Sequence, residues 1–419
     1  MTHFSIVVFW VLLGLIVAQG VPVVGYLCAL RRFHRKRLDD EDCPKAAVIL
    51  CVRGADPFLK DCLAGLSRQD YPQYEVHVVV DCQDDPAWEL VEQVAKREEA
   101  AHVRVHALTE RRRSCSLKIS GVLQAVAELD ESHRIVALLD SDTVPHPSWL
   151  RELVAPLADD RVGVSSGNRW YMPQQMTWGS LVRYLWNSAA VVHMYWYGIA
   201  WGGSLATRTS LLRETDLLQR LGHAFGEDST ICRCARRERL RVAFVPSLTM
   251  VNREVCSVSG FFHFLQRQLL TVRLHNPWWW AVVGHGIATS AALATGFVVL
   301  AAALVLGCWE AVGCSAAALA LYYVSMIVLM VMTESCVKRI VLARNEPARW
   351  LTPGRYVRLA LAIPLTQVVY AAGLTVTLFA RRHRWRGVLY LFGAGSRVRV
   401  VDDRPYEPEA GVSGTMASL

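Results

Sequence analysis

The stretch RIVALLDSDTVPHP, residues 134–147, decides the fold because an apolar run in it ends abruptly at polar residues. Ile135 to Leu139 is apolar at every position, which predicts a strand buried on both faces, as in a parallel sheet. Asp140 and Asp142 then follow at the carboxyl end of that strand, where open α/β sheets bind ligands. Two carboxylates at a strand tip can share one hard divalent cation, although an ordinary polar turn has the same pattern.

Strands and helices alternate along the chain on the amino side of this stretch. The predicted strands are 46–52, 74–80 and 103–107, the predicted helices are 56–68, 85–101 and a segment ending near 130, and a further strand is expected over 162–167. This alternation predicts a doubly wound, mostly parallel α/β sheet. Because crossovers are right-handed, the carboxyl ends of the strands should share one edge, where Asp81 would join Asp140 and Asp142.

The apolar residues, 53% of the 419, are concentrated towards the two ends of the chain. The apolar runs 4–30, 281–307, 311–333 and 359–380 predict membrane-spanning helices. The net charge of +8 comes largely from basic clusters beside these runs, at 31–37 and 381–386. Such placement indicates anionic lipid and a cytosolic flank, and it argues against nucleic acid as a partner.

These features divide the chain into five parts. We expect a membrane anchor and basic flank at 1–37, a cytosolic domain at 45–256, an interfacial amphipathic segment at 257–280, a transmembrane region at 281–380 and a basic, flexible tail at 381–419. The side of the tail stays open, because the last run would leave the cytosol and yet ends in a basic cluster. Pro364 and Gln367 also allow a broken or re-entrant segment there.

Two further motifs bear on chemistry. Trp201, Gly202 and Gly203 follow an aromatic-rich stretch, and paired glycines permit a backbone to approach a ligand closely, although a plain turn has the same composition. Glu227 and Asp228 precede a predicted helix, where acidic residues can also serve the helix dipole. Carboxylates on the sheet edge, a nearby Lys118 and a membrane frame together predict transfer from a nucleotide-diphosphate sugar.

Several segments, taken in order, resemble one known family. They are VRGADPFLKDCL (52–63), QDYPQYEVHVVVD (69–81), DDPAW (84–88), SLK (116–118), DSD (140–142), GGSLATRTSLL (202–212), GED (226–228) and FLQRQLLTVR (264–273). The chain therefore resembles membrane-bound GT-A glycosyltransferases of the family 2 type, and most closely the ceramide glucosyltransferase branch with its bacterial, hopanoid-associated relatives. One departure is that Leu270 and Thr271 stand where the family usually has Arg-Trp.

The resemblance implies a UDP-sugar donor, a divalent cation (Mg²⁺ or Mn²⁺) and inversion at the sugar carbon. It implies Asp228 as the general base and Asp142, with Asp140, as metal ligands. The implied donor-binding residues are Lys118, Asp140, Arg267, Gln268 and Arg273, with Asp81 and Asp84 as alternatives for the contact with the nucleoside. The expected acceptor-binding residues are Trp201, Gly202, Gly203 and Glu227.

Three functions are compatible with these residues. The leading hypothesis is a lipid glycosyltransferase that adds one sugar to a ceramide-like or hopanoid-like acceptor at the cytosolic leaflet, in a multi-pass protein of a bacterial inner membrane. The second is a processive polysaccharide synthase, which would normally need more spans to line a channel. The third is a non-catalytic membrane scaffold or transporter, although coupled transport normally needs more ionisable groups in the spans.

Overall fold

The structure is a computed structural model that describes residues 1–97, 100, 102–348 and 353–406. Its centre is a seven-stranded sheet with the order β3-β2-β1-β4-β6-β5-β7. The strands are β1 (Ala46–Val52), β2 (Tyr74–Val80), β3 (Val103–Ala107), β4 (Ile135–Leu139), β5 (Val162–Tyr171), β6 (Ser204–Arg208) and β7 (Arg241–Asn252). Only β6 runs antiparallel to its neighbours, so the expectation of a mostly parallel sheet is confirmed.

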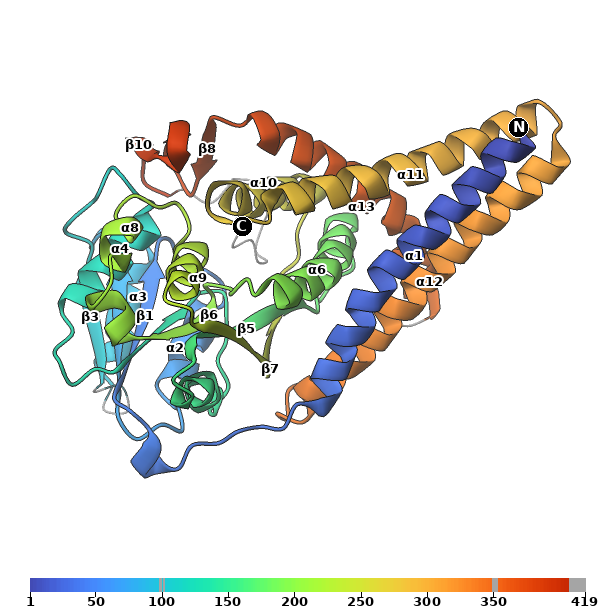
Figure 1. The fold of residues 1–419 in the computed structure, drawn as a ribbon. Helices are drawn as coiled ribbons and strands as arrows, with labels where there is room; N and C mark the ends of the chain where they lie inside the picture. The colour runs from blue at the N-terminus through green and yellow to red at the C-terminus, as the bar shows by residue number, and fades with distance from the viewer. Residues whose placement is uncertain (98–99, 101, 349–352, 407–419) are drawn as a thin grey trace.

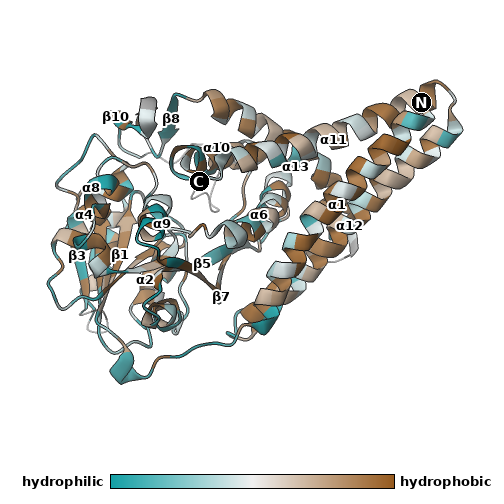
Figure 2. Ribbon diagram, in the orientation of Figure 1, coloured by the Kyte–Doolittle hydropathy of each residue, from teal (hydrophilic) through white to brown (hydrophobic). Residues whose placement is uncertain are grey.

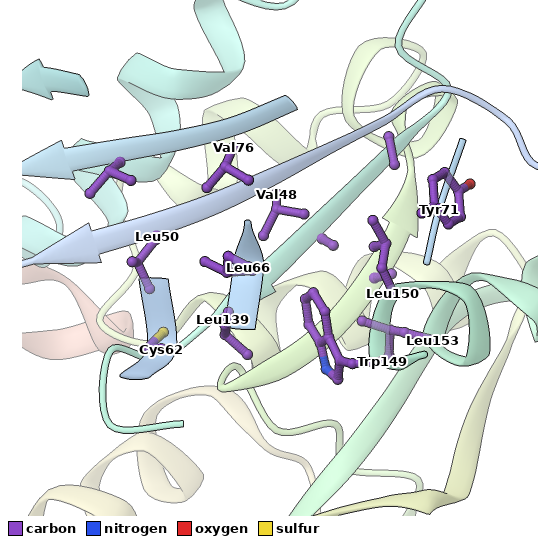
Figure 3. Close-up of a cluster of buried hydrophobic side chains, with 14 of the residues drawn as sticks. Val48, Leu50, Cys62, Leu66, Tyr71, Val76, Leu139, Trp149, Leu150 and Leu153 are labelled. Carbon is purple, nitrogen blue, oxygen red and sulfur yellow. The ribbon is translucent and has the colours of Figure 1, made fainter. Parts of the chain in front are cut away.

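Helices cover both faces of this sheet (Figure 1). Those of the sheet domain are α2 (Leu59–Leu66), α3 (Ala87–Ala95), α4 (Leu117–Ala127), α5 (Trp149–Val154), α6 (Trp178–Tyr197), α7 (Thr209–Arg213), α8 (Leu217–Leu221) and α9 (Glu227–Arg237). Alternate residues of the central strands point to opposite faces. Val48 and Leu139 therefore pack with Leu66 and Trp149 in one core (Figure 3), whereas Leu138 packs in a second core on the α4 side.

Within the described ranges, four helices are long and apolar enough to cross a membrane, which indicates an integral membrane protein. They are α1 (Thr2–Arg32), α11 (Trp279–Val305), α12 (Trp309–Leu342) and α13 (Pro353–Phe379). Helix α1 lies along α12, and both project away from the sheet domain with mainly hydrophobic surfaces (Figures 1 and 2). The predicted apolar runs match these helices to within a few residues, except that α12 continues for two further turns and α13 begins earlier.

Helix α13 differs from the broken segment that Pro364 allowed, because it runs through that residue as one helix. It packs against α6, α10 (Val258–His275) and α11. Neighbouring helices of this kind allow a proline inside an apolar helix. Its exposed apolar side chains recur along one side, at Val357, Leu361, Val368, Val376 and Phe379. The opposite side is buried, so α13 has one face on the protein and one apolar outer face.

The segment beyond α13 also differs from the expected flexible tail over its described part. It forms a three-stranded antiparallel sheet of β8 (Arg382–Trp385), β9 (Val388–Phe392) and β10 (Val398–Asp403). Alternate apolar residues of β9 and β10 face inward and pack against Phe225 and Leu270 of the sheet domain and α10. The basic cluster that was interpreted as a membrane flank forms β8 of this sheet. Residues 411–419, expected to be disordered, lie outside the described residues.

Candidate active site

The carboxyl ends of the parallel strands meet at a cavity of about 150 Å³. Asp81 follows β2 and Asp140 and Asp142 follow β4, and all three line this cavity, as the topology led us to expect. The opposite walls come from the start of α9, from α10 and from the hairpin between β8 and β9. The cavity therefore draws on segments from one end of the chain to the other.

Lys118 is one of the cations that line this cavity. It lies in the first turn of α4, whose N-cap Ser116 accepts a hydrogen bond from the Ile119 amide at 3.3 Å. The Lys118 Nζ atom is 2.6 Å from Asp140 Oδ1, and it also pairs with Glu227. Burial alone would raise the pKa of Asp140, but the charges of Lys118 and Arg169 outweigh burial and hold that pKa at about 2.

Arg169 bridges the two aspartates that were predicted to bind a metal. Its Nη2 atom lies 3.1 Å from Asp140 Oδ2 and 3.1 Å from Asp142 Oδ1. Burial, with the nearby charges of Asp140 and Asp56, raises the pKa of Asp142 to about 6 against the opposing charge of Arg169. A carboxylate that is this costly to ionise gains most from a closely bound cation.

The charge of the cavity lining also favours a bound cation. Among the described residues that line it, seven are carboxylates and five are cationic, which leaves a formal charge of −2. The carboxylates are Asp56, Asp81, Asp140, Asp142, Glu227, Asp228 and Glu254, and the cations are Arg53, Lys118, Arg169, Arg267 and Arg386. Oxygen ligands with excess negative charge suit Mg²⁺ or Mn²⁺. The residues present therefore fit a divalent cation at Asp142 and Asp140.

Asp228 lies at the start of α9 and lines the cavity. Its carboxylate accepts hydrogen bonds from the amides of Gly202, at 3.3 Å, and Ser229. Burial and the adjacent Glu227 raise the pKa of Asp228 to about 6, against the effects of Lys118 and the two amides. A carboxylate with this pKa is ionised at neutral pH and can still accept a proton from a hydroxyl in a transition state.

The two predicted glycines are required by close approaches. A Cβ atom at Gly202 would overlap the Glu227 carboxylate and come within 3.4 Å of Lys118 Nζ. A Cβ atom at Gly203 would overlap the Trp201 ring and Asp140. Trp201 itself lines the cavity, and the Arg169 guanidinium lies 4.7 Å from its ring centroid. Glycine at both positions thus lets Glu227, Lys118 and Asp140 gather.

Helix α10 separates its three predicted donor-binding residues. Arg267 and Gln268 line the cavity. Arg273 is six residues further along, about 240° around the helix, and faces away from it. Its guanidinium instead donates hydrogen bonds to the carbonyls of Thr377, Leu378 and Ala380 at the end of α13. Arg273 therefore lies outside the cavity, where we had expected it to touch the donor.

Asp81 and Asp84, which the resemblance left as alternatives, also occupy different surroundings. Asp81 is buried in the cavity wall, with Arg53 Nη1 at 3.3 Å and Arg111 Nη2 at 2.9 Å from its carboxylate. Asp84 is exposed outside the cavity. The neighbouring Asp85 caps α3 by accepting from the Gly54 and Ala87 amides. Gly203 is the other predicted residue that does not line the cavity, although it abuts Asp140.

The structure adds residues that were not predicted. Asp56 and Arg53 follow β1, and Asp56 accepts hydrogen bonds from Ser141 and Arg386. The aspartate was visible within the quoted segment 52–63, whereas Arg169 lies in the aromatic-rich stretch before Trp201 and was not singled out. Trp385 and Arg386 lay in a cluster interpreted as a membrane flank. A basic cluster can flank a membrane span or line a binding site, and the sequence does not distinguish the two. The packing of β8 and β9 shows that Trp385 and Arg386 line the cavity.

A second cavity, of about 300 Å³, adjoins the first. It is enclosed by α1, α6, α10, α11, α12 and α13, and its surface is mostly apolar. Trp201, Asp228, Gln268 and Thr271 line both cavities. A small polar group lies within the second one, where Gln19 donates to Thr289 at 3.2 Å and accepts from Tyr322 at 3.0 Å. The polar and apolar cavities therefore meet at Asp228.

One curated protein and two solved structures illustrate what this chain is similar to. A ceramide glucosyltransferase from Pyricularia oryzae is 36% identical over 76 residues, which make up 17% of this chain and 15% of that protein. A mannosyltransferase from Pyrobaculum calidifontis, solved in complex with GDP-Man and Mn²⁺, is 20% identical with a TM-score of 0.52, covering 81% of this chain and 99% of that one. TarS residues 1–349 from S. aureus are 15% identical with a TM-score of 0.38, covering 85% and 98%.

The mannosyltransferase shares the GT-A fold of this chain, and the structure of that relative holds a nucleotide sugar and Mn²⁺. The family model described as Glycosyl transferase family 21 matches residues 12–398, which is most of the chain. Membership of a family of transferases favours the two enzyme hypotheses over the scaffold. The chain therefore belongs to glycosyl transferase family 21, the ceramide glucosyltransferase family, and is a GT-A glycosyltransferase.

Proposed function

We propose that this protein is an inverting, metal-dependent glycosyltransferase that moves one sugar from a UDP-sugar to a lipid at the cytosolic leaflet. The observation that carries this proposal is the meeting of two unlike cavities at Asp228. The polar cavity suits a nucleotide diphosphate, and the apolar cavity suits a hydrocarbon chain. A carboxylate at their junction lies where the acceptor hydroxyl would meet the sugar carbon.

The donor half of the proposal rests on the charged groups of the polar cavity. Asp142, with Asp140, would hold Mn²⁺ or Mg²⁺, which supplies charge to stabilise the departing diphosphate. Lys118 and Arg267 line the same cavity, so their charges can meet the diphosphate oxygens directly. Asp81, held by Arg53 and Arg111, lies further along the cavity and is the candidate contact for the nucleoside.

Asp228 would act as the general base. Its carboxylate is oriented by the Gly202 and Ser229 amides, which leaves its remaining lone pairs for the acceptor hydroxyl. As the hydroxyl oxygen attacks the sugar carbon from the side opposite the diphosphate, its proton passes to Asp228 and the configuration inverts. Lys118 holds Glu227 and Asp140 in place beside this line of attack.

The apolar cavity favours a lipid over a growing polysaccharide. A sugar polymer needs a channel lined largely by polar groups, whereas the surface of this cavity is mostly apolar. The hydrogen-bonded group of Gln19, Thr289 and Tyr322 offers one polar contact along the hydrocarbon path. A ceramide-like or hopanoid-like acceptor, with a polar head and an apolar body, matches that distribution.

The path of α13 supports a membrane arrangement with three crossings. Near its start, Arg358 lies 5.7 Å from the ring centroid of Trp178 in α6, and at its end Arg273 of α10 caps it. Both ends therefore contact the domain that carries the active site. In this arrangement α1, α11 and α12 cross the bilayer, α13 lies along its cytosolic face, and the tail stays with the catalytic domain.

Mass spectrometry of reaction products tests the proposed function. Detergent-purified protein would be incubated with Mn²⁺, a panel of UDP-sugars and total membrane lipid. We expect UDP release and one lipid whose mass increases by a single sugar. The Asp228→Asn variant should bind UDP as the wild type does but form no product. A ladder of repeating sugar masses would support a polymer synthase instead, and release of no nucleotide from any donor would overturn the proposal.

A further inference from the structure

The hairpin between β8 and β9 reaches into the polar cavity from the far end of the chain. Trp385, Arg386, Val388 and Tyr390 line that cavity beside the sheet edge. Trp385 pairs with Val388, so Arg386 and Gly387 form a two-residue turn. Both have positive φ, 45° and 81°, as a type I′ hairpin requires. A bulky residue is uncommon in this conformation. The tight turn holds Arg386 at a defined place in the hairpin.

Arg386 contacts groups of the sheet edge, and its guanidinium also lies 5.3 Å from the Tyr406 ring centroid. It donates to Asp56 Oδ1 at 2.7 Å and to the Arg53 carbonyl. Its side chain is 12% exposed. The preceding residue, Trp385, contacts helix α10, because the Arg267 guanidinium lies 4.7 Å from the Trp385 ring centroid. The hairpin thus carries one cation into the cavity and holds another there.

The C-terminal sheet is fastened to the catalytic domain next to this hairpin. Asp403 of β10 lies 2.9 Å from Arg53 Nη2 and 2.6 Å from Arg111 Nη1, and both arginines also pair with Asp81. The apolar faces of β9 and β10 pack against Phe225 and Leu270. This packing makes the hairpin part of the cavity wall rather than a mobile flap.

We propose that Arg386 binds the diphosphate of the donor and that Trp385 is a positioning residue for Arg267. This rests on the proposed function, since it assigns the diphosphate to the polar cavity. Leu270 and Thr271 give α10 no cation or indole at those positions. The hairpin brings an indole and a guanidinium to the same cavity from 115 residues further along the chain.

Calorimetric UDP binding with Mn²⁺ and donor kinetics test this assignment. Arg386→Gln should weaken UDP binding and raise the donor KM by at least about 10-fold, the loss expected for a charge-assisted hydrogen bond. Arg384→Gln is the matched control, because Arg384 lies on the same hairpin but is exposed and pairs with Asp402 at 3.3 Å. Melting temperature would establish that each variant is folded.

A double-mutant cycle tests the role of Trp385. Trp385→Leu should raise the donor KM, but adding it to Arg267→Gln should cost little more, because both changes remove one contact. Equal UDP affinity for the wild type and Arg386→Gln, or additive losses in the cycle, would overturn the assignment. A wild type that binds no UDP would instead overturn the proposed function, so the two failures are distinguishable.

A second inference concerns a different end of the sheet and is independent of the donor. Glu75 and His77, at the start of β2, point to one face and meet His133, which precedes β4. One potential ligand atom from each lies within 4.8 Å of the others. His77 and His133 are buried, with 3% and 2% exposure. The donor cavity lies at the carboxyl ends of these strands, so the group is separate from Asp140 and Asp142.

The ring nitrogens of this group are not satisfied by hydrogen bonds. Within the described part of the chain, both nitrogens of His77 and Nε2 of His133 have no hydrogen-bond partner. The Glu75 carboxylate oxygens lie 3.7 Å from His77 Nε2 and 3.6 Å from His133 Nε2, too far for hydrogen bonds. Two ligands bound at Zn–N or Zn–O distances in a tetrahedral site are about 3.4 Å apart.

A carboxylate orients the His133 ring, as is common for histidines that bind metals. His133 Nδ1 lies 3.0 Å from Asp130 Oδ1, which leaves Nε2 directed towards Glu75. Lys45 Nζ lies 2.9 Å from Glu75 Oε1 and so occupies one of the two oxygens of that carboxylate. We infer that Glu75, His77 and His133 form a binding site for a Zn²⁺-like divalent metal that ties β2 to the segment before β4.

Cobalt spectroscopy tests this site without reference to activity. The full-length Asp142→Asn variant, which removes the proposed donor-site ligand, would be stripped with chelator and titrated with Co²⁺. We expect one equivalent to give the strong visible absorption of tetrahedral cobalt, and to raise the melting temperature. His77→Asn and His133→Asn should abolish both effects, while His146→Asn, a buried histidine elsewhere, should keep them. Absent absorption, or absorption unchanged in the His77 and His133 variants, would overturn the inference.

Discussion

At the scale of single residues, the proposed role of Asp228 as the general base predicts how turnover depends on pH. Its pKa is raised to about 6, so the fraction able to accept a proton falls as the pH drops through 6. We expect the turnover number to fall about 10-fold per pH unit below 6 and to level off above 7. Saturating Mn²⁺ separates this effect from protonation of Asp142. A rate unchanged between pH 7 and pH 5 would contradict the assignment of Asp228.

Gly202 shows how tightly the residues around Lys118 are packed. In Gly202→Ala the added Cβ atom would displace the Glu227 carboxylate from Lys118, so we expect at least a 10-fold loss of turnover with little loss of stability. Gly284→Ala is the control, since a Cβ atom at Gly284 meets nothing within 4 Å. Turnover and melting temperature would be measured for both. Full activity in Gly202→Ala would show that the close approach has no role.

Residue-scale prediction from the sequence succeeded where a residue follows a strand. Asp81, Asp140 and Asp142 line one cavity because parallel strands deliver their ends to one edge. It did not find Arg169, which lies within β5 and reaches the aspartates across the neighbouring strand. A strand-interior arginine has no local signature that separates it from an ordinary polar position.

At the scale of elements, α10 places Arg267 in the polar cavity and Arg273 against the end of α13, so we expect substitutions of the two arginines to have different effects. Arg273→Ala should lower the free energy of unfolding by about 1–2 kcal/mol, because it leaves the last carbonyls of α13 without donors. The melting temperature of this variant should fall accordingly. Its donor KM should not change. Arg267→Ala should do the reverse, raising the donor KM with a smaller effect on stability. A donor KM raised equally in both variants would contradict this division.

The regular elements before residue 140 were predictable because apolar strands alternate there with amphipathic helices. All four predicted strands, at 46–52, 74–80, 103–107 and 135–139, have the observed bounds. Strands β6 and β7 were not predicted, and the C-terminal sheet was missed because its arginines resemble a membrane flank. Those elements gain their stability from tertiary packing, which no local pattern records.

At the scale of the whole molecule, the proposed three-crossing arrangement predicts on which side of the membrane the C-terminus lies. A fluorescent reporter fused after Leu419 should fold on the same side as one inserted in the catalytic domain, because α13 returns to that domain. Green fluorescent protein and alkaline phosphatase fusions give opposite signals on the two sides of a bacterial inner membrane. Active alkaline phosphatase at the C-terminus would require α13 to cross and would contradict the arrangement.

The central claim is that the donor and a lipid acceptor occupy two cavities that meet at Asp228, and one measurement on Ala189→Trp tests it most directly. Ala189 is exposed in the apolar cavity, so the indole should fill that cavity without disturbing the core. Ala301→Trp, on α11 outside the cavity, is the control. UDP release and glycolipid would be quantified in the same reaction. We predict that Ala189→Trp keeps UDP binding and slow donor hydrolysis but loses glycolipid formation, and undiminished glycolipid formation would contradict the account.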